Sequence, residues 1–417
     1  MPAATRVALE TLGCKLNQAE AESLVRELEA AGFNIVAPEE SCDVYILNAC
    51  TVTATADTKA RHLLRRAFRN IPSPVLVITG CYDDNISSIE RAVPGAQIII
   101  CRDKTVLVPR LRALGYGGAI GGSRPPGRTR AFVKAQEGCR NFCAYCIVPL
   151  MRGREISLPL DDIASEVRAR VQEGYREIVL TGTEIGAYRH NYLGLPDLVR
   201  HILEETGVAR LRLSSLQPAE VTEALLKLGD SGRLCPHFHL SLQSGSGSVL
   251  RRMRRRYDVA EYHEAIVRIR AMFPEAAVTT DVIVGFPGET DAEFEDSLGL
   301  CASLGFARIH VFPFSPRPGT AAAAFPDPVA TVVKRERCRR MLALAKESAE
   351  AFRTRFLGKT LSVLWETWEN GVLSGYSENY IRVYAKAGVG LVNEIMTVGL
   401  TKPYRDGVWG EILGGAL

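Results

Sequence analysis

Short apolar runs that alternate with helical patterns constrain the fold of this chain more than any other feature of its sequence. Within residues 1–115, strands are predicted at Arg6–Leu12, Val44–Leu47, Val75–Thr79 and Gln97–Ile100, and helices at Gln18–Ala31, Asp57–Arg69 and Ile86–Arg91. A helix between two strands returns the chain to the same edge of a sheet, so the strands pair in parallel. This part of the chain therefore predicts an open parallel α/β sheet.

A second alternating series follows residues 116–130, which are rich in Gly, Pro and Arg and predict a linker. Its strands are predicted at Ala131–Ala135, Glu177–Leu180, Leu211–Ser214, Phe238–Leu242, Ala277–Val284 and Ala307–Phe312, separated by helices at 161–173, 195–205, 219–229, 246–254, 259–272 and 291–304. Such a series exceeds a flavodoxin-like sheet and falls short of a full eightfold barrel, so it favours a partial (β/α)6 barrel. A long polar helix is predicted at about 328–356.

The tail from Leu357 changes to period-2 alternation with Gly and Asn turns, which predicts a small antiparallel β-barrel. All three tryptophans of the chain lie in this tail. We therefore expect an α/β protein with four parts, at residues 1–115, 116–130 (the linker), 131–355 and 356–417.

Composition is ordinary for a globular protein, with 47% hydrophobic and 24% charged residues in 417. No apolar run is long enough to span a bilayer, and the first residues lack a signal-type apolar core, so we expect a cytoplasmic protein. Its eleven cysteines are then reduced, and their odd number excludes complete disulfide pairing. The net charge of +4 is too small to indicate a nucleic-acid partner by itself.

The sharpest motif is Cys139-Arg-Asn-Phe-Cys143-Ala-Tyr-Cys146, just after the first strand of the second series. Loops at the C-terminal ends of barrel strands are where active sites assemble. Three thiolates can hold three irons of a [4Fe–4S] cluster and leave the fourth iron open to a substrate or cofactor. The alternatives are a structural zinc site or incidental cysteines. A zinc site needs a fourth Cys or His nearby, and none follows at the usual spacing.

Three further cysteines, Cys14, Cys50 and Cys81, each lie just beyond a different predicted strand of the first series. Ligands in open α/β sheets converge from loops at the carboxyl ends of the strands, so these thiols can meet. Burial as small core residues is an equally good interpretation of their spacing. The remaining five cysteines are expected to pack in cores.

With the segments that surround these cysteines, the chain is identified as a member of a known superfamily. The triplet with Tyr145 resembles the radical S-adenosylmethionine (SAM) enzymes, and TLGCKLNQAEAE, NACTV and TGC resemble their methylthiotransferase branch. The similarity covers essentially the whole chain, including LTGTEIGAY, HLSLQSGSGSVLRRMRRRY, TDVIVGFPGET and HVFPFSPRPGTAA. The tail resembles a TRAM domain, a small RNA-binding β-barrel. CKLNQ and HVFPFSPRPGT are most similar to the subgroup that acts on N6-threonylcarbamoyladenosine in tRNA, next to the anticodon.

The resemblance implies two [4Fe–4S] clusters. One, on Cys139, Cys143 and Cys146, binds SAM and cleaves it to a 5′-deoxyadenosyl radical that abstracts the hydrogen at C2 of the adenine. An auxiliary cluster on Cys14, Cys50 and Cys81 delivers sulfur, and a second SAM supplies the methyl group. The implied partners are the tRNA anticodon stem-loop, SAM, an external electron donor and a sulfur source, with no membrane.

Residues at the other strand ends are candidates for contact with SAM, although each also suits an ordinary turn or packing role. They are Tyr145, Gly182, Glu184, Ser214, Ser215, Gln243 and Gly285. Basic and aromatic residues are candidates for RNA contact, although charge runs are often merely solvated and a small barrel needs aromatic core residues. They are Arg251, Arg252, Arg254, Arg255, Trp365 and Trp368.

Two other functions remain open at this level. A methylthiotransferase of this kind can act instead on isopentenyladenosine in tRNA or on ribosomal protein S12. A non-catalytic iron–sulfur RNA-binding protein is a different class, and it has no use for an open iron and should not cleave SAM.

Overall fold

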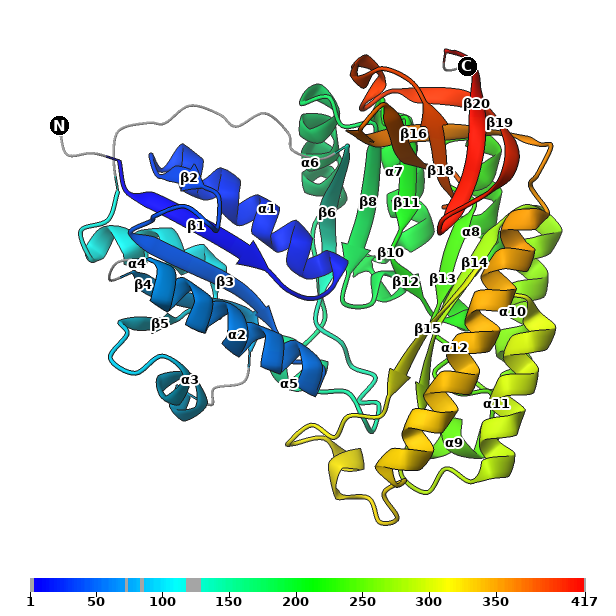
Figure 1. Ribbon diagram of the computed structural model, residues 1–417, viewed down its shortest axis with the longest axis horizontal. Coiled ribbons are helices and arrows are strands. Elements are labelled where there is room, and N and C mark those ends of the chain that lie inside the picture. Colours follow the sequence, from blue (N-terminus) through cyan, green and yellow to red (C-terminus); the bar gives the residue numbers. More distant parts are fainter. Residues whose placement is uncertain (1–3, 72–73, 83–85, 118–128, 416–417) are drawn as a thin grey trace. The chain divides into compact units, whose positions relative to one another are not determined.

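The computed structural model describes residues 4–71, 74–82, 86–117 and 129–415. The chain forms two compact units (Figure 1). The N-terminal unit comprises Met1–Pro125 and two later segments, Cys146–Arg154 and Ser315–Thr320; the second unit contains the rest. Most of the predicted linker, residues 118–128, lies outside the described residues.

The N-terminal unit is a five-stranded parallel sheet in the order β2-β1-β3-β4-β5. Its strands are β1 (Arg6–Thr11), β2 (Asn34–Val36), β3 (Val44–Cys50), β4 (Val75–Cys81) and β5 (Ile98–Ile100). Its helices are α1 (Lys15–Ala30), α2 (Ala54–Asn70), α3 (Ile86–Ala92), α4 (Leu107–Ala113) and the returning α5 (Val148–Arg152), with a 3-10 turn at Lys104–Val106. The predicted open parallel sheet is confirmed; β2, α4 and α5 were not predicted, because they are short.

Each face of this sheet has its own apolar core, which explains the continuous apolar runs of β3 and β4. Leu24 and Leu28 of α1 and Leu107 of α4 pack on one face. Leu64 of α2 and Ile89 of α3 pack on the other. Helices on both faces leave only the strand ends free to present polar or reactive side chains.

The second unit contains six parallel strands in series, which confirms the partial barrel. They are β6 (Arg130–Glu137), β8 (Glu177–Gly182), β11 (Arg210–Leu213), β13 (His237–Leu240), β14 (Ala277–Val284) and β15 (Arg308–Pro313). Hydrogen bonding divides them into two four-stranded sheets, β11-β8-β6-β7 and β12-β13-β14-β15, completed by the short β7 (Ile156–Ser157) and β12 (Ser215–Leu216). A small hairpin, β9 (Arg189–His190) and β10 (Leu193–Gly194), projects beside them.

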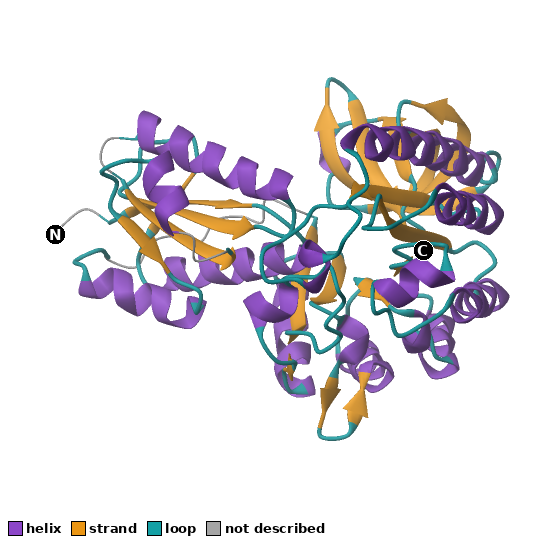
Figure 2. Ribbon diagram, turned by 90° about the horizontal axis from the view of Figure 1, so that it is seen from below, coloured by secondary structure: helices purple, strands orange, loops and turns teal. Residues whose placement is uncertain are grey.

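Helices cover the outside of this partial barrel (Figure 2). They are α6 (Leu160–Gln172), α7 (Leu195–Glu205), α8 (Glu223–Leu226), α9 (Gly247–Arg252), α10 (Val259–Met272) and α11 (Asp291–Leu304). The predicted helix at 219–229 is in fact α8 between two 3-10 turns, Pro218–Glu220 and Lys227–Ser231. The break occurs because Thr222 caps a new helix, its side chain accepting a hydrogen bond from the Leu225 amide at 3.2 Å.

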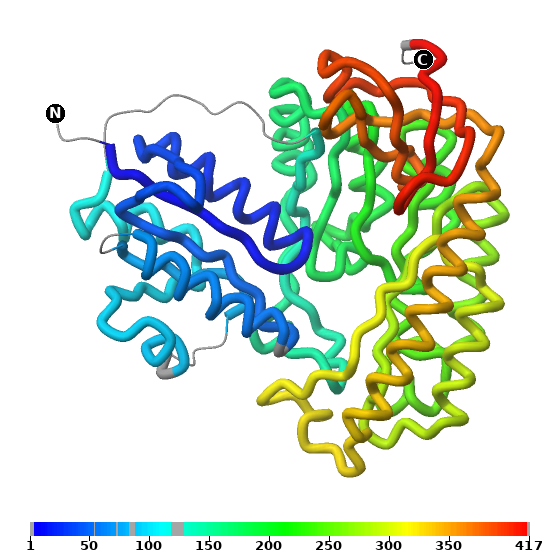
Figure 3. The backbone as a smooth tube through the Cα atoms, in the orientation of Figure 1, coloured from blue at the N-terminus to red at the C-terminus, as the bar shows by residue number. Residues whose placement is uncertain are grey.

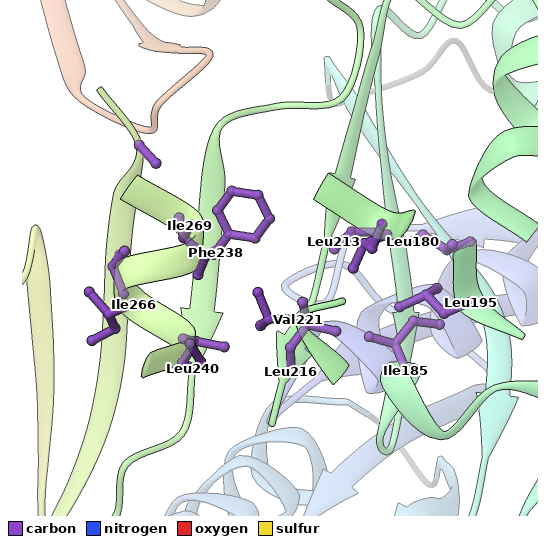
Figure 4. Close-up of a cluster of buried hydrophobic side chains, with 14 of the residues drawn as sticks. Leu180, Ile185, Leu195, Leu213, Leu216, Val221, Phe238, Leu240, Ile266 and Ile269 are labelled. Atoms are coloured by element: carbon purple, nitrogen blue, oxygen red, sulfur yellow. The ribbon is translucent and has the colours of Figure 1, made fainter. Parts of the chain in front are cut away.

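One apolar cluster holds the strands and helices of the barrel together (Figure 4). Leu180 and Leu213 come from neighbouring strands, while Ile266 and Ile269 of α10 pack near Phe238. The long helix α12 (Thr331–Thr354), the orange helix in Figure 3, adds Met341 to this cluster.

The C-terminal residues form a closed five-stranded barrel in the order β16-β17-β18-β20-β19, as predicted. Its strands are β16 (Thr360–Glu369), β17 (Val372–Ser377), β18 (Arg382–Lys386), β19 (Ile395–Tyr404) and β20 (Gly407–Gly415). One pair, β18 and β20, is parallel, and the other pairs are antiparallel. Trp365 is fully buried in the core of this barrel. Its predicted RNA contact is therefore wrong for this conformation, because a ring without exposed surface cannot stack on a base.

A buried ion-pair network joins this barrel to the first strands of the (β/α) series. Arg212 of β11 pairs with Glu177 of β8 at 2.7 Å, and its guanidinium lies 4.6 Å from the centre of the Tyr380 ring. Arg210 donates to the backbone oxygen of Ser362 at 2.6 Å. These bonds satisfy charges that would be costly to bury alone.

Candidate functional site

Three of the thiols in the N-terminal unit, those of Cys14, Cys50 and Cys81, lie at neighbouring strand ends. Cys50 and Cys81 are the last residues of β3 and β4 and face each other in register. Cys14 is the N-cap residue of α1, directly after the β1 loop, and it is exposed. Parallel pairing thus brings together three cysteines that the sequence separates widely.

Gly13 explains how the β1 loop approaches Cys50. Its φ is +109°, and a Cβ built on it would lie 2.7 Å from the Cβ of Cys50 and 3.2 Å from its Sγ. Only glycine allows this conformation and this approach. Burial, with the charges of Cys81 and Cys14 adding to it, raises the pKa of Cys50 to about 11. Because the charges of Cys14 and Cys81 both affect the pKa of Cys50, the three thiols lie close to one another.

Polar side chains hold the strand ends in place. Asn17 is fully buried and donates to the backbone oxygens of Leu12 and Ala49, both at 2.8 Å. Asn48 donates to the backbone oxygen of Asn17 at 2.6 Å. Arg152 of α5 donates from Nε to the Sγ of Cys81 at 2.9 Å. The sequence did not indicate these supporting residues, although Asn17 and Asn48 lie inside the segments TLGCKLNQAEAE and NACTV that carry the resemblance.

In the second unit, Cys139 and Cys143 lie in the loop after β6, and each thiol is half-buried. Positive φ angles at Gly138 and Phe142 curve this loop. Cys146, also half-buried, begins the segment Cys146–Arg154 that packs with the N-terminal unit. Burial raises the pKa of Cys139 well above its usual value, and the neighbouring Glu184 and Cys143 add to this effect.

Carboxylates surround Cys139. Its Sγ lies 3.1 Å from Oε2 of Glu184, and Asn141 donates to both oxygens of that carboxylate at 2.6 Å. The backbone amide of Glu184 donates to Gln136 at 3.0 Å. Burial and the charge of Glu184 raise the pKa of Glu220 to about 8. The sequence indicated Glu184 but missed Glu220, because no motif marks it.

The donor atoms around Cys139 do not form a structural zinc site, and the cysteine spacing suits an iron–sulfur cluster. Cys139, Glu155 and Glu184 offer ligand atoms within 4.8 Å of one another, which is a mixed set with only one thiol. Closed structural zinc sites instead use Cys and His ligands. The Cys-x3-Cys-x2-Cys spacing supplies three soft sulfur donors, which is what a cluster with one open iron requires.

Arg255 contacts the loop that carries Cys139 and Cys143. Its guanidinium donates to Cys143 Sγ at 3.2 Å and to Gln217 Oε1 at 3.3 Å, and it lies over the ring of Tyr257. The predicted RNA contact of Arg255 is corrected by this placement, because its donors face the thiol. Arg252 pairs with Glu293 at 2.8 Å, whereas Arg251 and Arg254 are exposed.

The remaining predicted SAM contacts lie at or just after the strand ends. Gly182 ends β8, and a Cβ there would lie 2.8 Å from Gln136 Oε1. Ser214 is buried, and its hydroxyl has no hydrogen-bond partner within the described segments; Ser215 is exposed.

The other three candidates lie in later loops or beside the cysteine loop. Gln243 has a φ of +66°. A Cβ on Gly285 would meet the side chain of Lys334 at 2.2 Å. Tyr145 packs beside the cluster of Ala144 and Phe286.

No disulfide joins any of the cysteines in the part of the chain that the structure describes. Among the described helices, none combines the length and apolar character that crossing a membrane requires.

Two family models match the chain: the Radical SAM superfamily at residues 133–301 and Uncharacterized protein family UPF0004 at residues 6–100. Among solved structures, the chain is similar to the radical S-adenosylmethionine methyltransferase TsrM from Kitasatospora setae, with a TM-score of 0.53 and 14% identity over 75% of this chain and 77% of that one. That likeness supports the fold.

Curated relatives match over nearly their full length. The threonylcarbamoyladenosine tRNA methylthiotransferase MtaB of Bacillus subtilis is 35% identical over 96% of this chain and 95% of its own. The enzyme of the same name from Thermotoga maritima is 36% identical over 90% of each chain. The tRNA-2-methylthio-N(6)-dimethylallyladenosine synthase of Syntrophotalea carbinolica is 34% identical over 97% of this chain and 98% of its own. The cysteine sites and these full-length similarities together show that the chain belongs to the family of radical SAM tRNA methylthiotransferases.

Proposed function

We propose that this enzyme inserts a methylthio group at C2 of N6-threonylcarbamoyladenosine, next to the anticodon of tRNA, using SAM and two [4Fe–4S] clusters. The observation that carries the proposal is the meeting of Cys14, Cys50 and Cys81 at three strand ends, in addition to the triplet that begins at Cys139. Cleaving SAM needs one cluster, so a second thiol set favours a reaction that also inserts sulfur. The names of the Bacillus subtilis and Thermotoga maritima relatives support this substrate.

In this proposal Cys139, Cys143 and Cys146 hold the SAM-binding cluster, whose chemistry is the one-electron reductive cleavage of SAM. The protein around it binds and orients SAM. Glu184 presents a carboxylate where the cationic amino group of SAM is expected to bind, and Asn141 fixes its orientation. Glu220 lies beside it with a raised pKa of about 8, so it is a neutral hydrogen-bonding group at neutral pH. The buried hydroxyl of Ser214 is a further hydrogen-bonding group for SAM. Contacts from Tyr145, Gly182, Ser215, Gln243 and Gly285 belong to the same proposal.

Cys14, Cys50 and Cys81 are proposed to hold the auxiliary cluster, the source of the inserted sulfur. Gly13 leaves room for the loop that carries Cys14 to lie against Cys50, which fits a compact three-thiol site. An external electron donor and a sulfur source complete the proposed cytoplasmic system. Residues 1–115 and 131–355 are the two proposed cluster-binding domains.

The anticodon stem-loop is proposed to bind through exposed basic and aromatic residues. Arg251 and Arg254 are exposed near α9, and Trp368 is 42% exposed on the C-terminal barrel, residues 356–417. Arginine contacts with phosphates and stacking on an aromatic ring are the ordinary means of binding single-stranded RNA.

Mass spectrometry of tRNA nucleosides tests the substrate. Cells that lack this chain should contain N6-threonylcarbamoyladenosine without its methylthio group, and expression of the chain should restore it. A variant with Cys14, Cys50 and Cys81 replaced by Ala is the matched control and should not restore it. If the methylthio group persists without the protein, the proposed substrate is wrong.

A second candidate substrate is N6-dimethylallyladenosine, which the name of the Syntrophotalea carbinolica relative favours. The same nucleoside analysis distinguishes the two, because loss of methylthio from the dimethylallyl nucleoside alone supports the second candidate.

A further inference from the structure

Arg152 is a buried arginine whose side chain contacts Cys81, one of the three strand-end thiols. It is the last residue of α5 and follows Cys146 closely in the sequence, yet the segment Cys146–Arg154 packs within the N-terminal unit. Its side chain is only 6% exposed. A buried cation at this place requires an explanation, because removing an arginine from water is costly unless its partners are well placed.

All three guanidinium nitrogens of Arg152 donate hydrogen bonds within the N-terminal unit. Nε donates to Cys81 Sγ at 2.9 Å, and one terminal nitrogen donates to Glu20 Oε1 at 2.7 Å. The other donates to Asn17 Oδ1 at 2.6 Å and to Glu20 Oε2 at 3.1 Å. Glu20 and Asn17 thus hold the two terminal nitrogens of the planar guanidinium, and Nε is directed at the sulfur of Cys81.

The partners of Arg152 are themselves fixed. Burial alone would raise the pKa of Glu20, but the hydrogen bonds and charges of Arg152 and Lys104 lower it to about 2. Glu20 is therefore a carboxylate at neutral pH. Asn17 is held by the backbone oxygens of Leu12 and Ala49, which belong to the same strand ends as Cys14 and Cys50. Arg152 is consequently connected to all three strand ends, directly to Cys81 and through Asn17 to the backbone of Leu12 and Ala49.

A simple ion pair does not account for the contact with sulfur. Lys104 already neutralises Glu20 at 2.8 Å, so the carboxylate has a partner without Arg152. A neutral thiol is a weak acceptor, whereas a metal-bound thiolate is anionic and accepts strong charge-assisted hydrogen bonds. The geometry around Cys81 suits the second state.

We propose that Arg152 is a positioning residue for the auxiliary cluster, which orients Cys81 and makes the cluster easier to reduce. This inference rests on the proposed function, in which Cys81 is a cluster ligand. Hydrogen bonds to ligand sulfur and nearby positive charge favour the more negative, reduced state, and thereby raise the reduction potential. Removal of the guanidinium should lower that potential and loosen the iron.

The test uses the full-length chain with Cys139, Cys143 and Cys146 replaced by Ala, so that bound iron reports the auxiliary site alone. Into this parent we introduce Arg152→Gln and Arg152→Lys. The control is Arg170→Gln, since Arg170 is similarly buried, at 7% exposure, and pairs with Glu166 and Glu173 away from the cysteines. Iron release to a chelator and the midpoint potential from an EPR-monitored redox titration are measured for each.

Arg152→Gln should release iron about tenfold faster or more and shift the midpoint to a more negative potential. Arg152→Lys keeps the charge but not the fork, so its shifts should be smaller in the same direction. Arg170→Gln should match the parent. If Arg152→Gln does not fold, a shift in the lysine variant still supports the proposal, and unchanged values in that variant overturn it.

These measurements test the auxiliary cluster and the role of Arg152 separately. A parent that binds no iron overturns the auxiliary cluster itself, and with it the role of Arg152. A parent that binds iron, with release rates and potentials unaltered by either Arg152 substitution, overturns the role of Arg152 and leaves the proposed function standing.

Discussion

The two cysteine triplets of this enzyme are built in opposite ways. Cys139, Cys143 and Cys146 lie within one short loop, whereas Cys14, Cys50 and Cys81 come from three strand ends. The first set is a property of local sequence, because a curved loop brings its own residues together. The second exists only when β1, β3 and β4 are paired in parallel. A contiguous motif therefore tolerates distant changes that a strand-end site does not.

Their electrostatic surroundings also differ. Cys139 is hydrogen-bonded to Glu184, whose charge also acts on the neighbouring Glu220, whereas Arg152 donates to Cys81. Carboxylates suit a cationic ligand such as SAM, and a guanidinium suits an anionic group such as a thiolate-bound cluster. This contrast supports different chemical roles for the two thiol sets.

The largest expected effect separates these roles. Replacing Cys139, Cys143 and Cys146 by Ala should remove about half of about eight irons and abolish SAM cleavage. Replacing Cys14, Cys50 and Cys81 should remove the other half, preserve SAM cleavage and abolish methylthio transfer. Iron analysis and chromatography of 5′-deoxyadenosine check both variants. Equal loss of SAM cleavage in the two variants would remove the distinction.

A backbone change should damage the strand-end site selectively. In Gly80→Ala, the new Cβ would lie 2.4 Å from Asn48 Oδ1 and 2.5 Å from the Ala49 oxygen, at a φ of +89°. The strain should cost about 1–3 kcal/mol and displace Cys81, so auxiliary iron is lost while SAM cleavage persists. Chemical denaturation and iron content are the measurements. Gly95→Ala is the control, because its φ is also positive, +78°, but its Cβ would meet nothing within 4 Å.

The two sites should respond oppositely to pH in the cluster-free protein. The pKa of Glu20 is lowered to about 2, so its stabilisation is present above the unfolded pKa and declines as pH falls toward 2. The pKa of Glu220 is raised to about 8, so its contribution is present below the unfolded pKa and is lost as pH rises through 8.

The measurement is the free energy of unfolding against pH, with one substitution for each site. Glu20→Gln should flatten the acid limb and cost about 3–5 kcal/mol at neutral pH, because it leaves buried Arg152 without its charge partner. Glu220→Gln should flatten the alkaline limb. An alkaline limb unchanged in Glu220→Gln would assign it to another group.

The smallest expected effect concerns tRNA. Arg251→Ala and Arg254→Ala should each reduce the slope of log affinity against log salt by about 1, if each contacts one phosphate. Arg255→Gln should leave this slope unchanged and instead weaken iron retention at Cys143, since Arg255 faces that thiol. Filter binding at several salt concentrations checks the slopes. A reduced slope in Arg255→Gln would restore the original RNA assignment.

Much of the fold was predictable because strand and helix periodicities are local. The six strands of the partial barrel and helix α12 lie where their patterns indicated, since apolar spacing follows backbone geometry. The prediction of one helix at 219–229 was wrong because Thr222 forms the N-cap of a separate helix. Apolar periodicity gives no sign of such a side-chain cap. The predicted RNA contacts of Trp365 and Arg255 were wrong for a similar reason. Whether a side chain is exposed depends on the residues that pack against it, and the sequence alone does not specify these.

The sequence by itself determined the alternating α/β architecture, the contiguous cysteine motif and the small C-terminal barrel, because each is encoded by residues close along the chain. Only the tertiary structure decided that Cys14 and Cys81 lie near enough to Cys50 to raise its pKa, that Arg152 donates to Cys81, and that Glu220 is buried beside Glu184. Contacts of this kind depend on which strand ends become neighbours and which charges are buried together. Those are properties of the packed molecule, and no spacing along the chain specifies them.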